Sequence, residues 1–303
     1  MDAMRKTSEV LIVGGYFCDL VFTGLPELPK LGHEVYSKEF HLIPGGVYNA
    51  AIALHRLGVD IVWPCRFGND PFSQYVKKQA IHEGVDARYF SDLDHPSLHI
   101  TAAFSFQDER AFLSYSDAEP EIGYAGLIRK TNPQWIYLTR LFIGKEVDEL
   151  VKAGRSVDAK IFMDCQAHAY SIKEMQVQEA LRAVDVFSPN RAEAEKLTGK
   201  SEMTKMLEML AEFTPVVIIK DGANGSYLAQ ENKVLHQPAH PVSVVDTTGA
   251  GDNFDSGFIF GQIKGFSMEK CLRIGNYCGG LSAQGFGGTS TSPTEKQVLE
   301  YLT

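Results

Sequence analysis

The sequence predicts an α/β fold in which helices cover a mostly parallel sheet and a small β-rich lid is attached. Short runs of β-branched and apolar residues alternate along the chain with segments of helical spacing, a pattern typical of βαβ units. The chain has 303 residues, of which 44% are hydrophobic, so it is long enough to bury a large core. We therefore expect residues 1–303 to form a single α/β domain.

The predicted strands are short apolar runs bounded by turn-forming residues. They lie at residues 10–13, 61–63, 136–138, 161–163, 184–187 and 216–219. Segments of helical spacing lie at residues 47–57, 72–82, 190–198, 250–260 and 268–284. Open α/β sheets bind ligands beyond the carboxyl ends of their strands, so polar residues that follow strands, such as Asp19, are candidate site residues.

Two segments lack helical spacing and form the predicted lid. Between residues 20 and 43, Pro26, Pro29 and Gly32 separate short β-like pieces. Residues 97–117 contain two apolar runs around a polar turn at 107–109, which predicts a hairpin. We expect these segments to close over a substrate and exclude water, and their exposed strand edges to pair with a second copy in a homodimer.

The motif around which the chain is organised is D-T-T-G-A-G-D at residues 246–252. It follows two β-branched residues and precedes a helical segment, so the amides of Gly249, Ala250 and Gly251 are expected to converge at a helix N-terminus. Such a terminus binds anions, and phosphate is the natural guest. A carboxylate beside a phosphate site repels the ligand unless it has a chemical role, and a base that faces an incoming hydroxyl would give Asp252 that role. We expect the helix dipole to keep Asp252 ionised. The alternative is a turn in which Asp252 only caps the helix.

Three further segments each allow a structural and a functional interpretation. Gly45-Gly46 with Asn49 suits either a glycine turn with a capping residue or a polyol site. Asn190 and Glu193 form either a capping box or an oxygen pair for hydrated Mg²⁺, and the two roles are compatible. The glycines at 222 and 225 suit either a hairpin or a loop along a nucleotide.

The D-T-T-G-A-G-D run and the N-x-x-E-x-E-x-L-T-G run at 190–199 resemble the two signatures of the ribokinase, or PfkB, family of small-molecule kinases. The resemblance extends from Asp19 to Gly288 with the motifs in the expected order, and it implies a ribokinase-like three-layer α/β/α sandwich. Two departures are a spacing of two residues, not three, between the glycine pair and Asn49, and Ser73 where glycine is usual.

The resemblance also implies a set of site residues. Asp252 is the implied catalytic base, with an anion hole at Gly249, Ala250 and Gly251. The implied sugar contacts are Asp19, Gly45, Gly46 and Asn49, and the implied nucleotide contacts are Lys220, Gly222, Gly225 and Asn276. The implied metal sites are Asn190 and Glu193 for Mg²⁺, through water, and Asp246, Thr248, Ala283 and Gly288 for a monovalent cation such as K⁺.

Composition excludes several other classes of protein. Asp plus Glu number 38 against 29 Lys plus Arg, a net charge of −9 without a basic block, so nucleic acid and anionic membrane are not expected partners. The five cysteines show no C-x-x-C pair, which favours the reducing cytoplasm. We find no transmembrane segment in the sequence.

The expected reaction is ATP-dependent transfer of the γ-phosphoryl group to a hydroxymethyl group of a sugar or related polyol. The alternatives are a nucleoside or inositol kinase of the same fold, and a sugar-binding sensor without catalysis. A dinucleotide oxidoreductase is disfavoured, since the turn at 14–17 lacks the three-glycine fingerprint.

Overall fold

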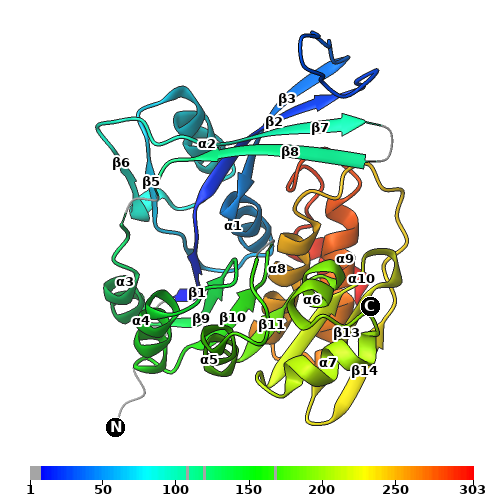
Figure 1. The fold of residues 1–303 in the computed structure, drawn as a ribbon. Helices are drawn as coiled ribbons and strands as arrows, with labels where there is room; N and C mark the ends of the chain where they lie inside the picture. Colours follow the sequence, from blue (N-terminus) through cyan, green and yellow to red (C-terminus); the bar gives the residue numbers. More distant parts are fainter. Residues whose placement is uncertain (1–7, 107–108, 119–120, 167–168) are drawn as a thin grey trace.

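A computed structural model of the chain describes residues 8–106, 109–118, 121–166 and 169–303. Its main sheet has eight strands in the order β14-β13-β12-β11-β10-β9-β1-β4 (Figure 1). The six strands from β12 to β4 are parallel, and β13 and β14 are antiparallel additions at one edge. The strands of this sheet are β1 (Ser8–Val13), β4 (Ile61–Val62), β9 (Pro133–Leu138), β10 (Lys160–Asp164), β11 (Val186–Ser188), β12 (Val216–Lys220), β13 (Ser226–Gln230) and β14 (Lys233–Gln237).

Alternation along the central strands divides the core into two halves. In β1, Val10 and Ile12 belong to the core on one face of the sheet, and Leu11 and Val13 to the core on the other. A strand covered on both faces is apolar at every position, which is why the sequence shows β1 as an uninterrupted apolar run.

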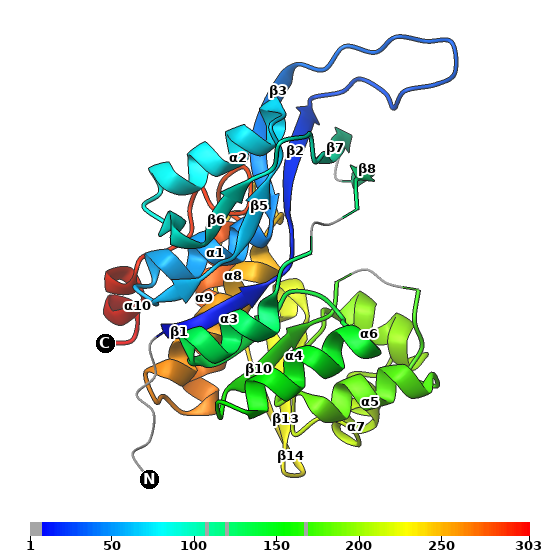
Figure 2. The same ribbon diagram turned by 90° about the vertical axis from the view of Figure 1, so that its left-hand side faces the viewer.

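Helices cover both faces of the sheet. One core includes apolar residues of α1, α8 and α9, and the other includes those of α4, α5, α6 and α7 (Figures 1 and 2). The predicted three-layer α/β/α sandwich is therefore confirmed. The helices are α1 (Val47–Arg56), α2 (Pro71–His82), α3 (Tyr124–Thr131), α4 (Lys145–Arg155), α5 (Met175–Ala183), α6 (Arg191–Thr198), α7 (Met203–Ala211), α8 (Ala250–Ile263), α9 (Met268–Ser282) and α10 (Glu295–Tyr301).

A separate four-stranded sheet, which we call the lid, lies over the carboxyl ends of the main strands (Figure 2). Its order is β3-β2-β7-β8, from β2 (Tyr16–Thr23), β3 (Glu39–Gly46), β7 (His99–Phe106) and β8 (Glu109–Ser116). The lid strands overlap the segments expected at 20–43 and 97–117. The first of them begins earlier than expected, because β2 starts directly after the two residues, Gly14 and Gly15, that follow β1. Asp19 consequently lies within a lid strand and not in a turn after β1. The expected turn at 107–109 falls partly on residues 107–108, outside the described residues.

The sequence did not predict a small two-stranded sheet of β5 (Cys65–Phe67) and β6 (Phe90–Asp92). Each strand has three residues, too few for a periodic signal. Among the described residues, no helix is long and apolar enough to cross a membrane.

Candidate active site

The start of α8 combines a tight turn with close packing. Gly249 has a φ of +69°, and a Cβ there would lie 2.5 Å from the Cα of Gly288, so the turn requires glycine. The helix that follows is anchored by Phe254, Phe258 and Ile259, all buried in the core. Packing therefore fixes the first turn of α8 at the carboxyl ends of the sheet.

Two of the three amides expected to receive an anion are available. The Ala250 N–H donates to the carbonyl of Thr247 at 3.2 Å, so it closes the turn instead. Within the described part of the chain, no acceptor is recorded for the N–H of Gly249 or Gly251. The Ala250 N–H would have to leave this carbonyl to complete the three-amide anion hole, which stays a prediction.

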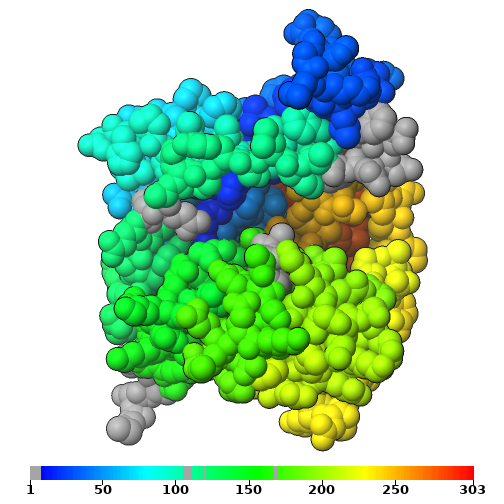
Figure 3. Space-filling model, in the orientation of Figure 1, coloured from blue at the N-terminus to red at the C-terminus, as the bar shows by residue number. Residues whose placement is uncertain are grey.

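A cavity of about 630 Å³ opens in front of this turn. Figure 3 shows the same face of the molecule hollowed between the lid and the body. The predicted residues that line the cavity are Asn190, Glu193, Lys220, Gly222, Gly225, Gly249, Ala250, Gly251, Asp252, Asn276 and Ala283. The remaining predicted residues do not line it: these are Asp19, Gly45, Gly46, Asn49, Asp246, Thr248 and Gly288.

Asp252 lies in the first turn of α8, where the cavity meets a group that we call the lid-side residues: Asp19, Gly45, Gly46 and Asn49. Its Oδ2 accepts a hydrogen bond of 3.3 Å from Nδ2 of Asn49, in the first turn of α1. Burial, and then the charge of Asp164, raises the pKa of Asp252 to about 7. Burial thus opposes the helix dipole, which favours the anion, and the expectation that Asp252 stays ionised remains a prediction.

The lid-side residues form a second group beyond Asp252. Asp19 lies over Gly45, where a Cβ would approach the Asp19 Oδ2 to 2.4 Å. Burial, and then the charge of Asp246, raises the pKa of Asp19 to about 6. Gly46, with a φ of +62°, is the N-cap of α1 and brings Asn49 into the first helical turn. The Asn49 Oδ1 is buried and has no donor among the described residues, so this group offers an unused acceptor beside Asp252.

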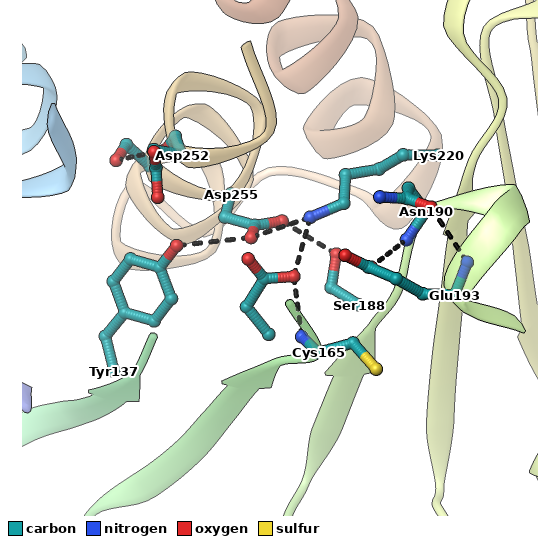
Figure 4. Close-up of polar contacts among 10 residues, drawn as sticks. Tyr137, Cys165, Ser188, Asn190, Glu193, Lys220, Asp252 and Asp255 are labelled. Carbon is teal, nitrogen blue, oxygen red and sulfur yellow. Dashed lines mark hydrogen bonds and ion pairs between the residues drawn. The ribbon is translucent and has the colours of Figure 1, made fainter. Parts of the chain in front are cut away.

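Lys220 has different partners from those expected. Its Nζ lies 2.9 Å from Oδ1 of Asp164 and 2.9 Å from Oδ2 of Asp255 (Figure 4). Burial alone lowers the pKa of Lys220, but the two carboxylates raise it above its usual value, so the ammonium stays charged. Lys220 also lines the cavity, and an ammonium has three N–H donors, so its predicted contact with the nucleotide stays a prediction.

The chain was compared with protein families and with known proteins. Residues 26–295 match the family model described as "pfkB family carbohydrate kinase". Ribokinase of Bacillus subtilis (strain 168) is 28% identical, over 97% of this chain and 99% of that protein. A structure of Arabidopsis thaliana ribokinase complexed with ribose and ATP superposes with a TM-score of 0.85 at 24% identity, covering 98% of this chain and 99% of that one.

The chain belongs to the pfkB family of carbohydrate kinases. It is accordingly a phosphotransferase with an alcohol group as acceptor. The fructokinase of Vibrio cholerae O395, solved with fructose, ADP and calcium ion, shares the fold with a TM-score of 0.76 at 20% identity, over 99% of this chain and 100% of that one.

In this kinase, Asn190 and Glu193 form the capping box of α6. The Asn190 Oδ1 accepts from the Glu193 N–H at 2.9 Å, and Glu193 Oε2 accepts from the Asn190 N–H at 2.8 Å. Burial, and then the charge of Asp164, raises the pKa of Glu193. Both residues line the cavity, so the capping box leaves one Glu193 oxygen, Oε1, for another partner.

The residues predicted to contact the nucleotide line the rest of the cavity. Nδ2 of Asn276 donates to the carbonyls of Gln237 and Pro238 at 2.9 and 3.0 Å, which holds that segment against α9. Gly225 has a φ of +89° and packs against the same segment, since a Cβ there would lie 2.1 Å from the carbonyl oxygen of Gln237. Residues 239–242 form a wall that the sequence reasoning missed, because no motif marks it.

The four residues expected to bind a monovalent cation lie near one another, but their oxygens have other partners. Oδ1 of Asp246 accepts from the Thr248 N–H at 2.7 Å, and Oδ2 accepts from the Gly287 N–H at 2.9 Å. The Ala283 carbonyl accepts from the Asp246 N–H at 3.1 Å. The Gly288 carbonyl accepts from Nδ2 of Asn253 at 2.6 Å. These hydrogen bonds hold the two segments together without an ion, so K⁺ binding stays a prediction from the sequence.

Sequence reasoning also missed Asp255 as part of the site. Its carboxylate is fully buried and accepts hydrogen bonds from Ser188 and Tyr137 in addition to Lys220. The available signal was a carboxylate inside the apolar stretch that follows Asp252, which is costly to bury without a partner.

Proposed function

We propose that this kinase transfers the γ-phosphoryl group of ATP to a hydroxymethyl group of a sugar or related polyol. The observation that supports this most directly is the junction at Asp252. A carboxylate, two unoccupied helix-terminal amides and the amide of Asn49 meet between a nucleotide-sized cavity and the lid. Asp19 and Gly45 stand on the lid side of that junction.

The mechanism assigns a separate role to each group. The amides of Gly249 and Gly251 would hold the oxygens of the transferred phosphoryl group, where charge changes during transfer. The ionised Asp252 would accept the proton of the acceptor hydroxyl as its bond to phosphorus forms. A pKa of about 7 suits this role, because a base works best when its pKa lies near the working pH.

The donor set in the cavity suits Mg²⁺ that arrives with the nucleotide. Asp164, Glu193 and Asp252 supply only oxygen, the ligand type that Mg²⁺ prefers. Because the described residues contain no cluster of three or more His, Cys, Asp or Glu able to hold a metal alone, the nucleotide phosphates and water would have to complete the shell. When bound, Mg²⁺ would neutralise phosphate charge, and Glu193 with Asn190 would orient its waters.

The substrate side is built for hydroxyl groups. Asp19 offers acceptors and, when protonated, a donor, while Asn49 has an unused Oδ1 next to Asp252. Such a pair would orient a polyol so that one hydroxyl reaches Asp252. Ribokinases and fructokinases are among the relatives, which supports a sugar as the first class to test.

The test is a coupled assay of ADP release over sugars, polyols, inositols and nucleosides, with Mg²⁺ present. We expect turnover with at least one sugar or polyol and little with nucleosides. Turnover restricted to nucleosides would contradict the proposed acceptor. Sugar binding without ADP release across the whole panel would instead support a sensor.

We also propose that the kinase forms a homodimer through the outer face of the lid, the face turned away from Asp19. Paired residues on that face are apolar in successive rows: Phe40, Phe22 and Phe104 form one row, and Leu42, Leu20, Ala102 and Leu113 form the next. Helix α2 contacts β2, β3 and β7, but Leu113 remains 68% exposed. An exposed apolar face of this kind favours a protein partner, and a second copy offers the same face.

A further inference from the structure

The carboxylate of Asp255, one turn after Asp252 on α8, is fully buried. Its Oδ1 accepts from Ser188 at 2.7 Å, and its Oδ2 accepts from Tyr137 at 3.2 Å and from Lys220 at 2.9 Å (Figure 4). Lys220 also reaches Asp164 at 2.9 Å. We call Tyr137, Asp164, Ser188, Lys220 and Asp255 the anchor cluster.

The anchor cluster ties one helix to four neighbouring strands. Tyr137 belongs to β9, Asp164 to β10, Ser188 to β11 and Lys220 to β12, and these strands are consecutive in the sheet. All four residues lie in the carboxyl-terminal halves of their strands. The first turn of α8 is therefore fixed against the part of the sheet that faces the cavity.

Fold stability alone does not account for this cluster. Burying two carboxylates around one ammonium costs hydration, and apolar residues of similar volume often stabilise a core as well or better. Apolar neighbours are at hand, since the rings of Tyr137 and Phe162 lie 5.4 Å apart and those of Phe162 and Phe258 lie 6.0 Å apart. Apolar packing already holds α8 against the sheet, and the directional hydrogen bonds of the anchor cluster add a specific orientation of the helix to that packing.

The position of α8 determines where the Asp252 carboxylate lies. It precedes Asp255 by three residues, so the two side chains lie on neighbouring parts of the helix surface, about 4.5 Å apart along the axis. The only side-chain hydrogen bond recorded for the Asp252 carboxylate within the described residues is the 3.3 Å bond from Asn49. Its position is thus set mainly by the helix that carries it.

We propose that Asp255 is a positioning residue: by anchoring α8 one turn after Asp252, directly to β9, β11 and β12 and through Lys220 to β10, it holds the Asp252 carboxylate where the acceptor hydroxyl arrives. This inference rests on the proposed function, in which Asp252 is the base. Asp255 itself is fully buried and does not line the cavity, so it acts through Asp252.

Three variants and one matched control test the proposal. Asp255→Asn removes the charge, while Ser188→Ala and Tyr137→Phe each remove one donor to it. Ser8→Ala is the control, because Ser8 is also a buried serine with a hydrogen-bonded hydroxyl on a main-sheet strand, but it lies at the amino end of β1. We expect kcat to fall about 100-fold for Asp255→Asn and about fivefold for the two milder variants, with both KM values within about twofold. Ser8→Ala should leave kcat unchanged.

A double variant separates positioning from loss of folded protein. If Asp255 acts through Asp252, adding Asp255→Asn to Asp252→Asn should lower kcat by less than about twofold. A similar loss in both backgrounds would overturn the proposal, as would Ser188→Ala and Tyr137→Phe behaving like Ser8→Ala. Should Asp255→Asn fail to fold by circular dichroism, Ser188→Ala combined with Asp252→Asn gives the same comparison. Normal turnover of Asp252→Asn alone would instead contradict the proposed function, so the two failures are distinct.

Discussion

Asp252 carries the proposed chemistry, and its surroundings set its properties. It lies at a helix N-terminus, where the dipole favours a carboxylate, yet burial raises its pKa to about 7. A base of that strength is ionised in about half of the molecules at neutral pH. The same side chain lies between the cavity and the residues of the lid side, in reach of Asn49.

The first prediction concerns the proposed base itself. Asp252→Asn keeps the shape of the side chain but cannot accept a proton, so kcat should fall by roughly 10² to 10⁴. ATP affinity, measured by calorimetry, should change little, because the amides of Gly249 and Gly251 remain. Turnover near the parent rate would contradict the assignment.

The second prediction concerns pH. Because burial raises the pKa of Asp252 to about 7 and that of Asp19 to about 6, both carboxylates take up protons as the pH falls. The value of kcat/KM for the sugar should therefore fall about tenfold per pH unit below 7, and more steeply below 6.

Asn49 provides an internal check on the pH profile. The hydrogen bond from Asn49 lowers the pKa of Asp252, although burial raises it by more. Asn49→Leu removes that bond, so the pH below which kcat/KM falls should move to a higher value. A profile that is flat between pH 6 and 8 in the parent kinase would contradict a raised pKa for Asp252.

The third prediction tests the lid-side group. Gly45→Ala would place a methyl group 2.4 Å from the unaltered position of Asp19 Oδ2, so Asp19 must move. We expect KM for the sugar to rise about tenfold, the equivalent of 1.4 kcal/mol, with KM for ATP unchanged. Gly123→Ala is the control, because nothing lies within 4 Å of a Cβ at Gly123. An equal rise in both KM values would argue against a sugar site at Asp19.

At the scale of elements, α6 shows how one motif can serve two purposes. The capping box of Asn190 and Glu193 satisfies the helix N-terminus and also turns both residues toward the cavity. Helix α10 has a second capping box, made by Thr294 and Gln297, that does not border the cavity. The two capping boxes can therefore be compared within one chain, because the one in α6 borders the cavity and the one in α10 does not.

The fourth prediction separates capping from metal organisation. Glu193→Gln preserves the capping box, since glutamine fills the same position, but removes the charge. The Mg²⁺ concentration for half-maximal activity should rise about tenfold or more, with little change in the free energy of unfolding. Thr294→Ala should do the opposite, lowering the free energy of unfolding by about 1 kcal/mol without affecting the Mg²⁺ requirement. An unchanged Mg²⁺ requirement in Glu193→Gln would leave Glu193 with the structural role alone.

At the scale of the whole molecule, the main sheet and the lid have separate roles in the proposed reaction. The main sheet holds the cavity and the first turn of α8, and the lid brings Asp19 from the other side. Only a lid that comes down on Asp252 can exclude water from the reacting groups. The outer face of the lid has a different role, because in the proposed homodimer it packs against the same face of a second copy.

The fifth prediction tests that dimer. Leu113→Asp places a charge on the outer face of β8, away from Asp19, and should convert the dimer to a monomer in sedimentation velocity. Leu299→Asp, on the exposed part of α10, is the control for adding a charge at an exposed leucine. A parent kinase that sediments as a monomer at micromolar concentration would refute the interface.

Much of the fold could be predicted because its signals are local. The strands of the main sheet are continuous apolar runs, and α6 is bounded by Asn190 and Gly199, which cap its two ends. The turn before α8 requires glycine at 249, so its position is also visible in the sequence. The two-stranded sheet of β5 and β6 had no such signal.

The sequence by itself determined the alternation of strands and helices, the lid segments, and the glycine turn before α8, since each depends on residues close together in the chain. Only the tertiary structure decided which side chains meet. Asn49 reaches Asp252 across 203 residues, and Lys220 lies between Asp164 and Asp255 at the edge of the cavity. The pKa of Asp252 was decided in the same way, because burial depends on packing between distant segments, whereas the helix dipole that suggested an ionised carboxylate is a local property.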